Sequence, residues 1–196
     1  MFEECKQFDI IAFSLGGRIA LNTIATNPSL IRRAHITGVS AERDPMAKII
    51  LASWKDLLSP KEGGGSLKPF AWSIILATYS DRFLARNGPE KVSSWVEHIC
   101  FNHILIQMGL LSLLQQTGEL EPIELADQIV RCRCSKTQIQ LAVGGDDKIS
   151  TCDQVEKLRV ALELDNSVLI YKDCGHAVLN ERAVRWRKDA LEFLNR

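Results

Sequence analysis

The sequence has no excess of charge of either sign, because 24 lysines and arginines balance 24 aspartates and glutamates in 196 residues. Without a net positive field, nothing favours a nucleic acid or an anionic membrane surface as a partner. Long apolar runs are also missing: the most apolar stretch, residues 99–114, is interrupted by polar side chains and is shorter than the roughly 18 apolar residues of a membrane span. The chain does not open with a basic segment followed by an apolar one, so no secretory leader is expected and the protein is predicted to be cytoplasmic.

Cysteine is too scarce and too scattered for a disulfide scaffold, with six residues spread over the chain. Cys132 and Cys134 are separated by one residue, whereas zinc and redox pairs need a gap of two. We therefore expect reduced, structural cysteines and no metal site. The glycine-rich stretch 59–66 lacks the lysine and serine or threonine of a phosphate-binding loop and is predicted to be a flexible surface loop.

The composition that remains, 46% apolar and 24% charged, is typical of a soluble globular domain. Near the start, the apolar run 8–12 leads directly into a segment with apolar residues at helical spacing. Pro28 ends that helix, because proline has neither the donor nor the space to continue it, and residues 34–39 form the next strand. Two strands joined by a helix predict a parallel βαβ unit.

Strand patterns return only near the C-terminus, at 138–143 and 167–171, each followed by a helical pattern at 152–164 and 182–194. Between them, residues 44–130 have mixed helical spacing and little β-branched alternation. The sequence thus predicts an α/β fold: a parallel sheet of about four strands with helices on both faces. One discontinuous core would consist of residues 1–43 and 131–196, interrupted by a helical insert at 44–130.

Ser14 stands where the first strand meets its helix, with the small residues Ala12 and Gly16 two positions before and after it. This is the setting of a nucleophile elbow, a turn so sharp that the serine backbone is strained and its hydroxyl is exposed. A helix that begins directly after Ser14 directs its free N–H groups at the hydroxyl, and the Leu15 N–H could donate to an oxyanion.

With these motifs, the sequence resembles the α/β-hydrolase superfamily, in which the order along the chain is nucleophile, acid, histidine. The resemblance implies Ser14 as nucleophile, Asp147 in the Gly144–Ile149 turn as acid, and His176 in the Gly-His turn after the last strand as general base. Asp146 is the alternative acid. It also implies that the 44–130 insert is a helical cap, and it argues against the epoxide hydrolases and dehalogenases of the superfamily, which have aspartate at the elbow.

The implied activity is hydrolysis of a small lipophilic carboxylic ester, thioester or amide through an acyl-enzyme, without metal or organic cofactor. The resemblance covers only the C-terminal part of the family domain, from the elbow onward, so the loop that gives the second oxyanion donor lies outside it. Losing one such donor costs on the order of 100- to 1000-fold in rate, so this chain is expected to be a weak enzyme alone. A non-catalytic interaction module and an acyltransferase are the alternatives.

The strand at 8–12 would lack a neighbour on one side, and a bare strand edge invites pairing. A partner chain or a second copy is expected there. Of the remaining side chains, His35, His98 and His103 are interpreted as hydrogen-bonded structural histidines, and Arg18 as solvated surface. The apolar residues of the insert are expected to pack in a helical core, with the lining of an acyl pocket as the alternative; they are Phe101, Ile104, Leu105, Met108, Leu110, Leu111 and Leu114.

Overall fold

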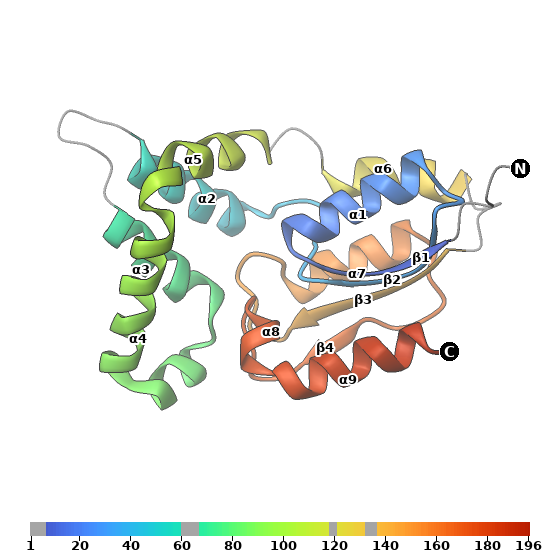
Figure 1. Cartoon of the computed structure of the whole chain (residues 1–196). Coiled ribbons are helices and arrows are strands. Elements are labelled where there is room, and N and C mark those ends of the chain that lie inside the picture. The colour runs from blue at the N-terminus through green and yellow to red at the C-terminus, as the bar shows by residue number, and fades with distance from the viewer. Residues whose placement is uncertain (1–6, 60–66, 118–120, 132–136) are drawn as a thin grey trace, which may run out of the picture.

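The computed structural model describes residues 7–59, 67–117, 121–131 and 137–196, and Figure 1 shows them as a sheet with its helices beside a separate group of helices. In chain order the elements are β1 (Phe8–Phe13), α1 (Leu15–Thr26), β2 (Ile31–Thr37), α2 (Pro45–Leu58), α3 (Leu67–Thr78), α4 (Asp81–His103), η1 (Ile104–Ile106), α5 (Gln107–Gln116), α6 (Pro122–Arg131), β3 (Gln138–Gly144), α7 (Cys152–Ala161), β4 (Leu169–Tyr171), α8 (Val178–Glu181) and α9 (Ala183–Leu194).

The four strands form one parallel sheet in the order β1-β2-β3-β4, which confirms the predicted α/β class and strand number. Helices α1, α6 and α7 cover one face and α9 the other (Figure 1). The central strands are buried on both faces because both are covered, and their face toward α9 carries the polar His35 and Thr37. Ile36 and Leu141, which are paired in register, are both fully buried. All strands end at the same edge of the sheet, where the loops that follow them meet.

The helices α2 to α5, with η1, are called here the helical layer. They have a hydrophobic core of their own, centred on Trp54, Leu58 and Phe70. Asp44 begins this layer by capping α2: its side chain accepts a hydrogen bond of 2.8 Å from the Ala47 N–H. Helix α6 also lies in the predicted insert, but its apolar face packs with α1 and α7 in the core of the sheet. The division of the chain at residues 44 and 130 remains a prediction.

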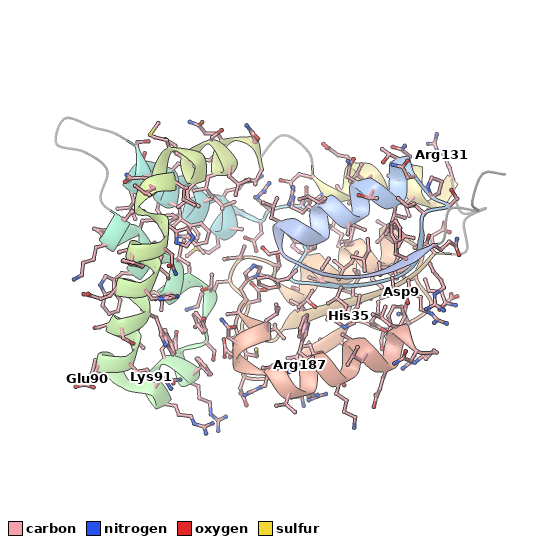
Figure 2. All side chains as sticks on the ribbon, in the orientation of Figure 1. Asp9, His35, Glu90, Lys91, Arg131 and Arg187 are labelled. Carbon is pink, nitrogen blue, oxygen red and sulfur yellow. The ribbon has the colours of Figure 1, made fainter. Side chains whose placement is uncertain are left out.

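Helix α4 is interrupted at Gly88, whose φ is 78°. Pro89 follows it, and a proline both removes a backbone donor and disfavours the helical conformation of the residue before it. Glycine takes the left-handed conformation that results at no steric cost. The break lets one continuous segment turn a corner at the outer end of the helical layer, near the labelled Glu90 and Lys91 in Figure 2.

The expectation of core packing is wrong for three apolar residues of the insert. Phe101, Leu105 and Met108 are 81%, 94% and 61% exposed. Helix α5 packs on α2 along one stripe only, so its opposite side and the corner at η1 remain uncovered. Leu111, by contrast, is buried in the core of the helical layer as expected.

Several predicted boundaries shift by a few residues. The helix predicted to reach residue 164 ends at Ala161, shortly before Glu163, which has a φ of 49°. The closing helix is preceded by the short α8, which the pattern had not indicated. Cys100, Cys152 and Cys174 are free thiols. Cys5, Cys132, Cys134 and residues 60–66 of the loop predicted at 59–66 lie outside the described residues.

In the described part of the chain, no single helix is both long and apolar enough to cross a membrane. Helices α4 and α5 together pass that test by length and composition only, with a bend of 94° between them.

Candidate active site

Ser14 occupies a strained turn between β1 and α1. Its φ of 50° and ψ of −120° lie in a region that a residue with a side chain rarely adopts. The turn is held because the Ser14 N–H donates to the Thr37 carbonyl (2.9 Å) and the Ser14 carbonyl accepts from the Gly17 N–H (2.9 Å). The Ser14 side chain does not cap its own helix, which leaves its hydroxyl free to point elsewhere.

The structure brings Ser14, His176 and Asp147 together, although 162 residues separate the serine from the histidine. The Ser14 Oγ lies 2.9 Å from His176 Nε2, and His176 Nδ1 lies 2.7 Å from Asp147 Oδ2. Asp147 and His176 are both buried. The second oxygen of Asp147 accepts from the N–H groups of Ile149 and Ser150, each at 2.8 Å. Both carboxylate oxygens are therefore engaged, which fixes the orientation of the imidazole.

Asp146 does not take this role. Its side chain is exposed, and its backbone N–H donates to the Cys174 carbonyl at 2.8 Å. Leu15 is the first residue of α1, and among the described residues no hydrogen bond uses its N–H. Leu15 lines the cavity beside Ser14, which is the position that an oxyanion donor needs.

Two glycines allow the histidine loop to sit where it does. Gly38, at the end of β2, has a φ of 68°, and a Cβ there would lie 3.0 Å from the Cε1 atom of His176. A Cβ on Gly175 would lie 2.6 Å from the Thr78 carbonyl oxygen and 2.7 Å from the Ser80 nitrogen. A larger residue at either position would push the imidazole or the helical layer out of place.

Glu181 on α8 ties the histidine loop to the helical layer, and the sequence analysis missed it. One carboxylate oxygen accepts from the Ser80 N–H (2.8 Å) and the Gly175 N–H (2.9 Å), and the other accepts from the Ser80 hydroxyl. The Ala177 N–H also donates to the Thr78 carbonyl at 2.8 Å. The two halves of this contact are 101 residues apart, so no local sequence pattern could have indicated it.

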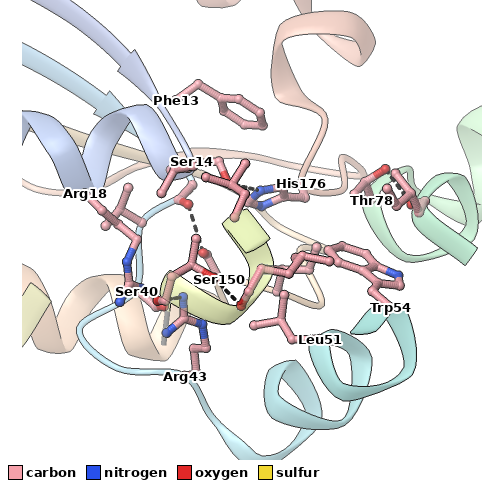
Figure 3. A pocket seen from close by; sticks show the side chains of 18 residues that line it. Phe13, Ser14, Arg18, Ser40, Arg43, Leu51, Trp54, Thr78, Ser150 and His176 are labelled. Atoms are coloured by element: carbon pink, nitrogen blue, oxygen red, sulfur yellow. Dashed lines mark hydrogen bonds between the residues drawn. The ribbon is translucent and has the colours of Figure 1, made fainter. Parts of the chain in front are cut away.

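Two cavities meet at His176. The first, called here the serine cavity, has a volume of about 310 Å³ and borders Ser14, Leu15 and His176; Figure 3 shows its apolar wall of Leu51 and Trp54. The second, called here the aromatic cavity, has a volume of about 520 Å³. It lies between the histidine loop and helices α3 and α4, and its described lining includes Tyr79, Phe83, Trp95, His98 and Asn180.

One end of the serine cavity is charged. Arg18 and Arg43 both pair with Glu121, at 2.8 Å and 2.9 Å, and both side chains are largely buried. Burial lowers the pKa of Arg43, and the neighbouring Arg18 acts in the same direction, while Glu121 opposes both. The expectation that Arg18 is solvated surface is therefore wrong. The sequence around Arg18 does not predict this contact, because the partner Glu121 is 103 residues away in the chain.

The other histidines differ from one another. His98 Nε2 accepts from the Asn102 amide and His103 Nδ1 donates to the Ile99 carbonyl, both at 2.8 Å, as expected for structural histidines. His35 is the exception: it is buried in β2 under Trp186 and Phe193 of α9, and neither ring nitrogen has a partner among the described residues (Figure 2). Burial lowers the pKa of His35 to about 4, which keeps the ring neutral.

No three His, Cys, Asp or Glu side chains gather as they would around a metal ion in the described ranges of the chain. Ser14, His176 and Asp147 are a hydroxyl, an imidazole and a carboxylate joined in one chain of hydrogen bonds. The arrangement can remove a proton from a hydroxyl and stabilise the imidazolium that results.

The sequence matches no protein-family model. A curated protein, the pyrrolizixenacetamide deacetylase of Xenorhabdus hominickii, is 26% identical over 130 residues, which are 64% of this chain and 47% of that protein. The chain therefore spans about half the length of this relative.

Three solved structures are similar in shape and distant in sequence. The enol-lactonase of Burkholderia xenovorans LB400 has a TM-score of 0.73 at 16% identity, over 98% of this chain and 67% of that one. A thermophilic esterase of Thermogutta terrifontis has a TM-score of 0.72 at 18% identity, over 96% and 65%. MGS-M2, an α/β-hydrolase enzyme from a Medee basin deep-sea metagenome library, has a TM-score of 0.64 at 19% identity, over 98% and 66%. At this identity the likeness shows the fold alone.

Proposed function

This chain has the fold of part of an α/β-hydrolase, and we propose that it catalyses the serine-dependent hydrolysis of a small lipophilic carboxylic ester, thioester or amide. The observation that carries the proposal is the pair of hydrogen bonds that joins Ser14 to His176 (2.9 Å) and His176 to Asp147 (2.7 Å). The deacetylase relative is consistent with cleavage of an acyl group.

His176 acts as the general base and Ser14 as the nucleophile. Nε2 takes the hydroxyl proton while Oγ attacks the carbonyl carbon, and Asp147 holds the ring and stabilises its positive charge. His176 then returns the proton to the leaving group, and water releases the acyl group from Ser14 in the reverse sequence of steps. Leu15 N–H donates to the oxyanion, and the strained turn at Ser14 keeps the hydroxyl and this donor at the same edge of the sheet.

The helical layer serves as the cap of this site. It provides Leu51, Trp54 and Ile74 to the serine cavity, whose lining is mostly apolar. Such a wall favours a lipophilic acyl group over a charged or extended polar one. No cofactor enters this mechanism.

The edge of the sheet at β1 is where we expect further chain to pair. Among the described residues β1 is hydrogen-bonded to β2 alone, and Phe8 and Ile11 are 51% and 41% exposed. A bare apolar edge favours pairing with a partner chain or a second copy. Sedimentation velocity across a range of protein concentrations tests the second copy: a monomer at all concentrations would leave only a different partner chain.

The central test treats the purified chain with a fluorophosphonate probe and locates the adduct by mass spectrometry. We expect an adduct on Ser14, and none in the Ser14→Ala variant. A folded circular dichroism spectrum without an adduct would refute the hydrolase proposal and support a non-catalytic interaction module. Transfer of the acyl group to an added alcohol or thiol in preference to water would instead identify an acyltransferase.

A further inference from the structure

The two cavities differ in how they border the reacting atoms. Both reach His176, and both are bounded by Phe13, Ile74 and Thr78. Ser14 and Leu15 line the serine cavity, whereas neither is among the described residues that line the aromatic cavity. The imidazole therefore stands between a cavity that contains the nucleophile and a cavity that does not.

The chemistry of acyl transfer distinguishes these two positions. In the acyl-enzyme the carbonyl carbon is bonded to Ser14 Oγ and its oxygen lies at the oxyanion donor, so the acyl group occupies the cavity that Ser14 and Leu15 border. The leaving group must lie on the side of His176 Nε2, because this nitrogen gives it a proton as the carbon–oxygen bond breaks. The serine cavity is taken by the acyl group, and the second cavity that borders His176 is the aromatic cavity, which Ala177 and Asn180 also line.

The far wall of the aromatic cavity is built from three rings that lie nearly parallel. Tyr79 and Phe83 have centroids 5.4 Å apart with 14° between their planes, and Tyr79 and Trp95 have centroids 5.5 Å apart with 26° between theirs. Phe83 and Trp95 are 6.0 Å apart at 24°. The Asn180 amide donates to the Tyr79 hydroxyl, which holds the first ring against α8. A flat aryl group gains more from such a wall than a puckered alkyl group of similar size.

We propose that the aromatic cavity receives the leaving group of the substrate and selects a flat aryl group, while the serine cavity holds the acyl group. This rests on the proposed function. In the first step the Ser14 Oγ–carbon bond forms, the bond from carbon to the leaving oxygen breaks, and the serine proton passes through His176 Nε2 to that oxygen. A neutral aryl-bearing alcohol leaves, and water then hydrolyses the acyl-enzyme to the carboxylic acid and restores Ser14.

The test compares two acetates whose alcohols differ in flatness, benzyl acetate and cyclohexylmethyl acetate. In the Phe83→Leu variant we expect the ratio of their kcat/KM values to fall by about three- to tenfold, because one ring of the wall is lost and apolar volume is kept. Phe83→Tyr retains the ring and should retain the ratio. The matched control is Leu113→Ala in the serine cavity, which should change the preference for acetate over hexanoate and leave the benzyl ratio within about twofold.

Binding of the product alcohol provides a second measurement that needs no turnover. Fluorine NMR of 4-fluorobenzyl alcohol, titrated with the Ser14→Ala chain, should give a Kd that Phe83→Leu raises about threefold or more and Leu113→Ala leaves unchanged. The opposite pattern, or no binding by a chain whose Ser14 is labelled by the fluorophosphonate, overturns the cavity assignment and leaves the proposed function intact. A folded chain whose Ser14 is not labelled overturns the proposed function and, with it, the assignment of a leaving group.

Discussion

The sheet with its helices and the helical layer bury their apolar residues to different extents. The core of the sheet holds fully buried side chains on the face that α1 and α7 cover, such as Leu21, Ile36 and Leu158. The helical layer has a smaller core and leaves Phe101 and Leu105 almost fully exposed. The first region carries Ser14, Asp147 and His176, whereas the second lines the cavities beside them. Glu181 joins the two regions through hydrogen bonds to Ser80 and Gly175.

The largest effect should come from the sheet region. Asp147→Asn keeps the shape of the side chain but removes the charge that orients and stabilises the His176 ring. We expect kcat/KM for an ester to fall by about 10⁴-fold. Asp146→Asn is the matched control, because that side chain is exposed, and its rate should stay within about twofold. Equal losses in the two variants would mean that the acid has been assigned to the wrong residue.

The second-largest effect should come from Glu181, whose hydrogen bonds join the two regions. Glu181→Ala leaves the Ser80 and Gly175 donors buried without an acceptor. We expect the free energy of unfolding to fall by about 3 kcal/mol, measured by urea denaturation. Glu192→Ala removes an exposed carboxylate of α9 and should change stability by less than about 0.5 kcal/mol. A fall of similar size in both variants would show that the buried network adds nothing to stability.

A pH-dependent effect should appear in the sheet region at His35. His35 has a folded pKa lowered to about 4, against about 6.5 in the unfolded chain. The unfolded state binds the proton first, so His35 costs stability as the pH falls from about 6.5 to about 4, by roughly 3 kcal/mol in total. Above about pH 6.5 the ring is neutral in both the folded and the unfolded chain, so His35 no longer lowers the free energy of unfolding.

His35→Leu should remove this share of the pH dependence. Between pH 7 and pH 4 the free energy of unfolding of the variant should fall by about 3 kcal/mol less than that of the wild type, as measured by urea denaturation at each pH. His98→Leu is the control, because His98 is exposed on α4, and it should follow the wild-type curve. If His35→Leu also followed the wild-type curve, the pKa of His35 would be the same in the folded and unfolded states.

The smallest effect should come from the helical layer. Leu105→Lys places a charge where the side chain is already 94% exposed, so we expect a change in unfolding free energy of less than about 0.5 kcal/mol. Leu111 is buried on the face of α5 that packs against α2. Leu111→Lys should therefore lower the free energy of unfolding several times more than Leu105→Lys does. A large loss for Leu105→Lys would mean that the exposed corner is covered in solution.

The sequence predicts what depends on local patterns. The strand, tight turn and helix around Ser14 are made of residues that are neighbours in the chain, and so is the Gly-His turn at His176. Such local patterns indicate the strands and, through the resemblance to α/β-hydrolases, the three residues that the structure brings together. Four apolar strand patterns, each followed by a helical pattern, also predict the four parallel strands.

What the sequence does not predict is long-range pairing. Glu181 with Ser80, and Arg18 with Glu121, join residues about a hundred positions apart that have no local pattern in common. His35 has the spacing of an ordinary strand residue, and only α9 packed over it makes its nitrogens unpartnered. The exposure of Phe101 likewise depends on which elements pack against its helix in the folded chain.

The contact between Glu181, Ser80 and Gly175 limits how this protein can open. If the helical layer swung away as a rigid lid at that point, it would pull on the residue next to His176 and disturb the imidazole. Separation of the helical layer from the sheet at that point would therefore also loosen the hydrogen bond between His176 and Ser14.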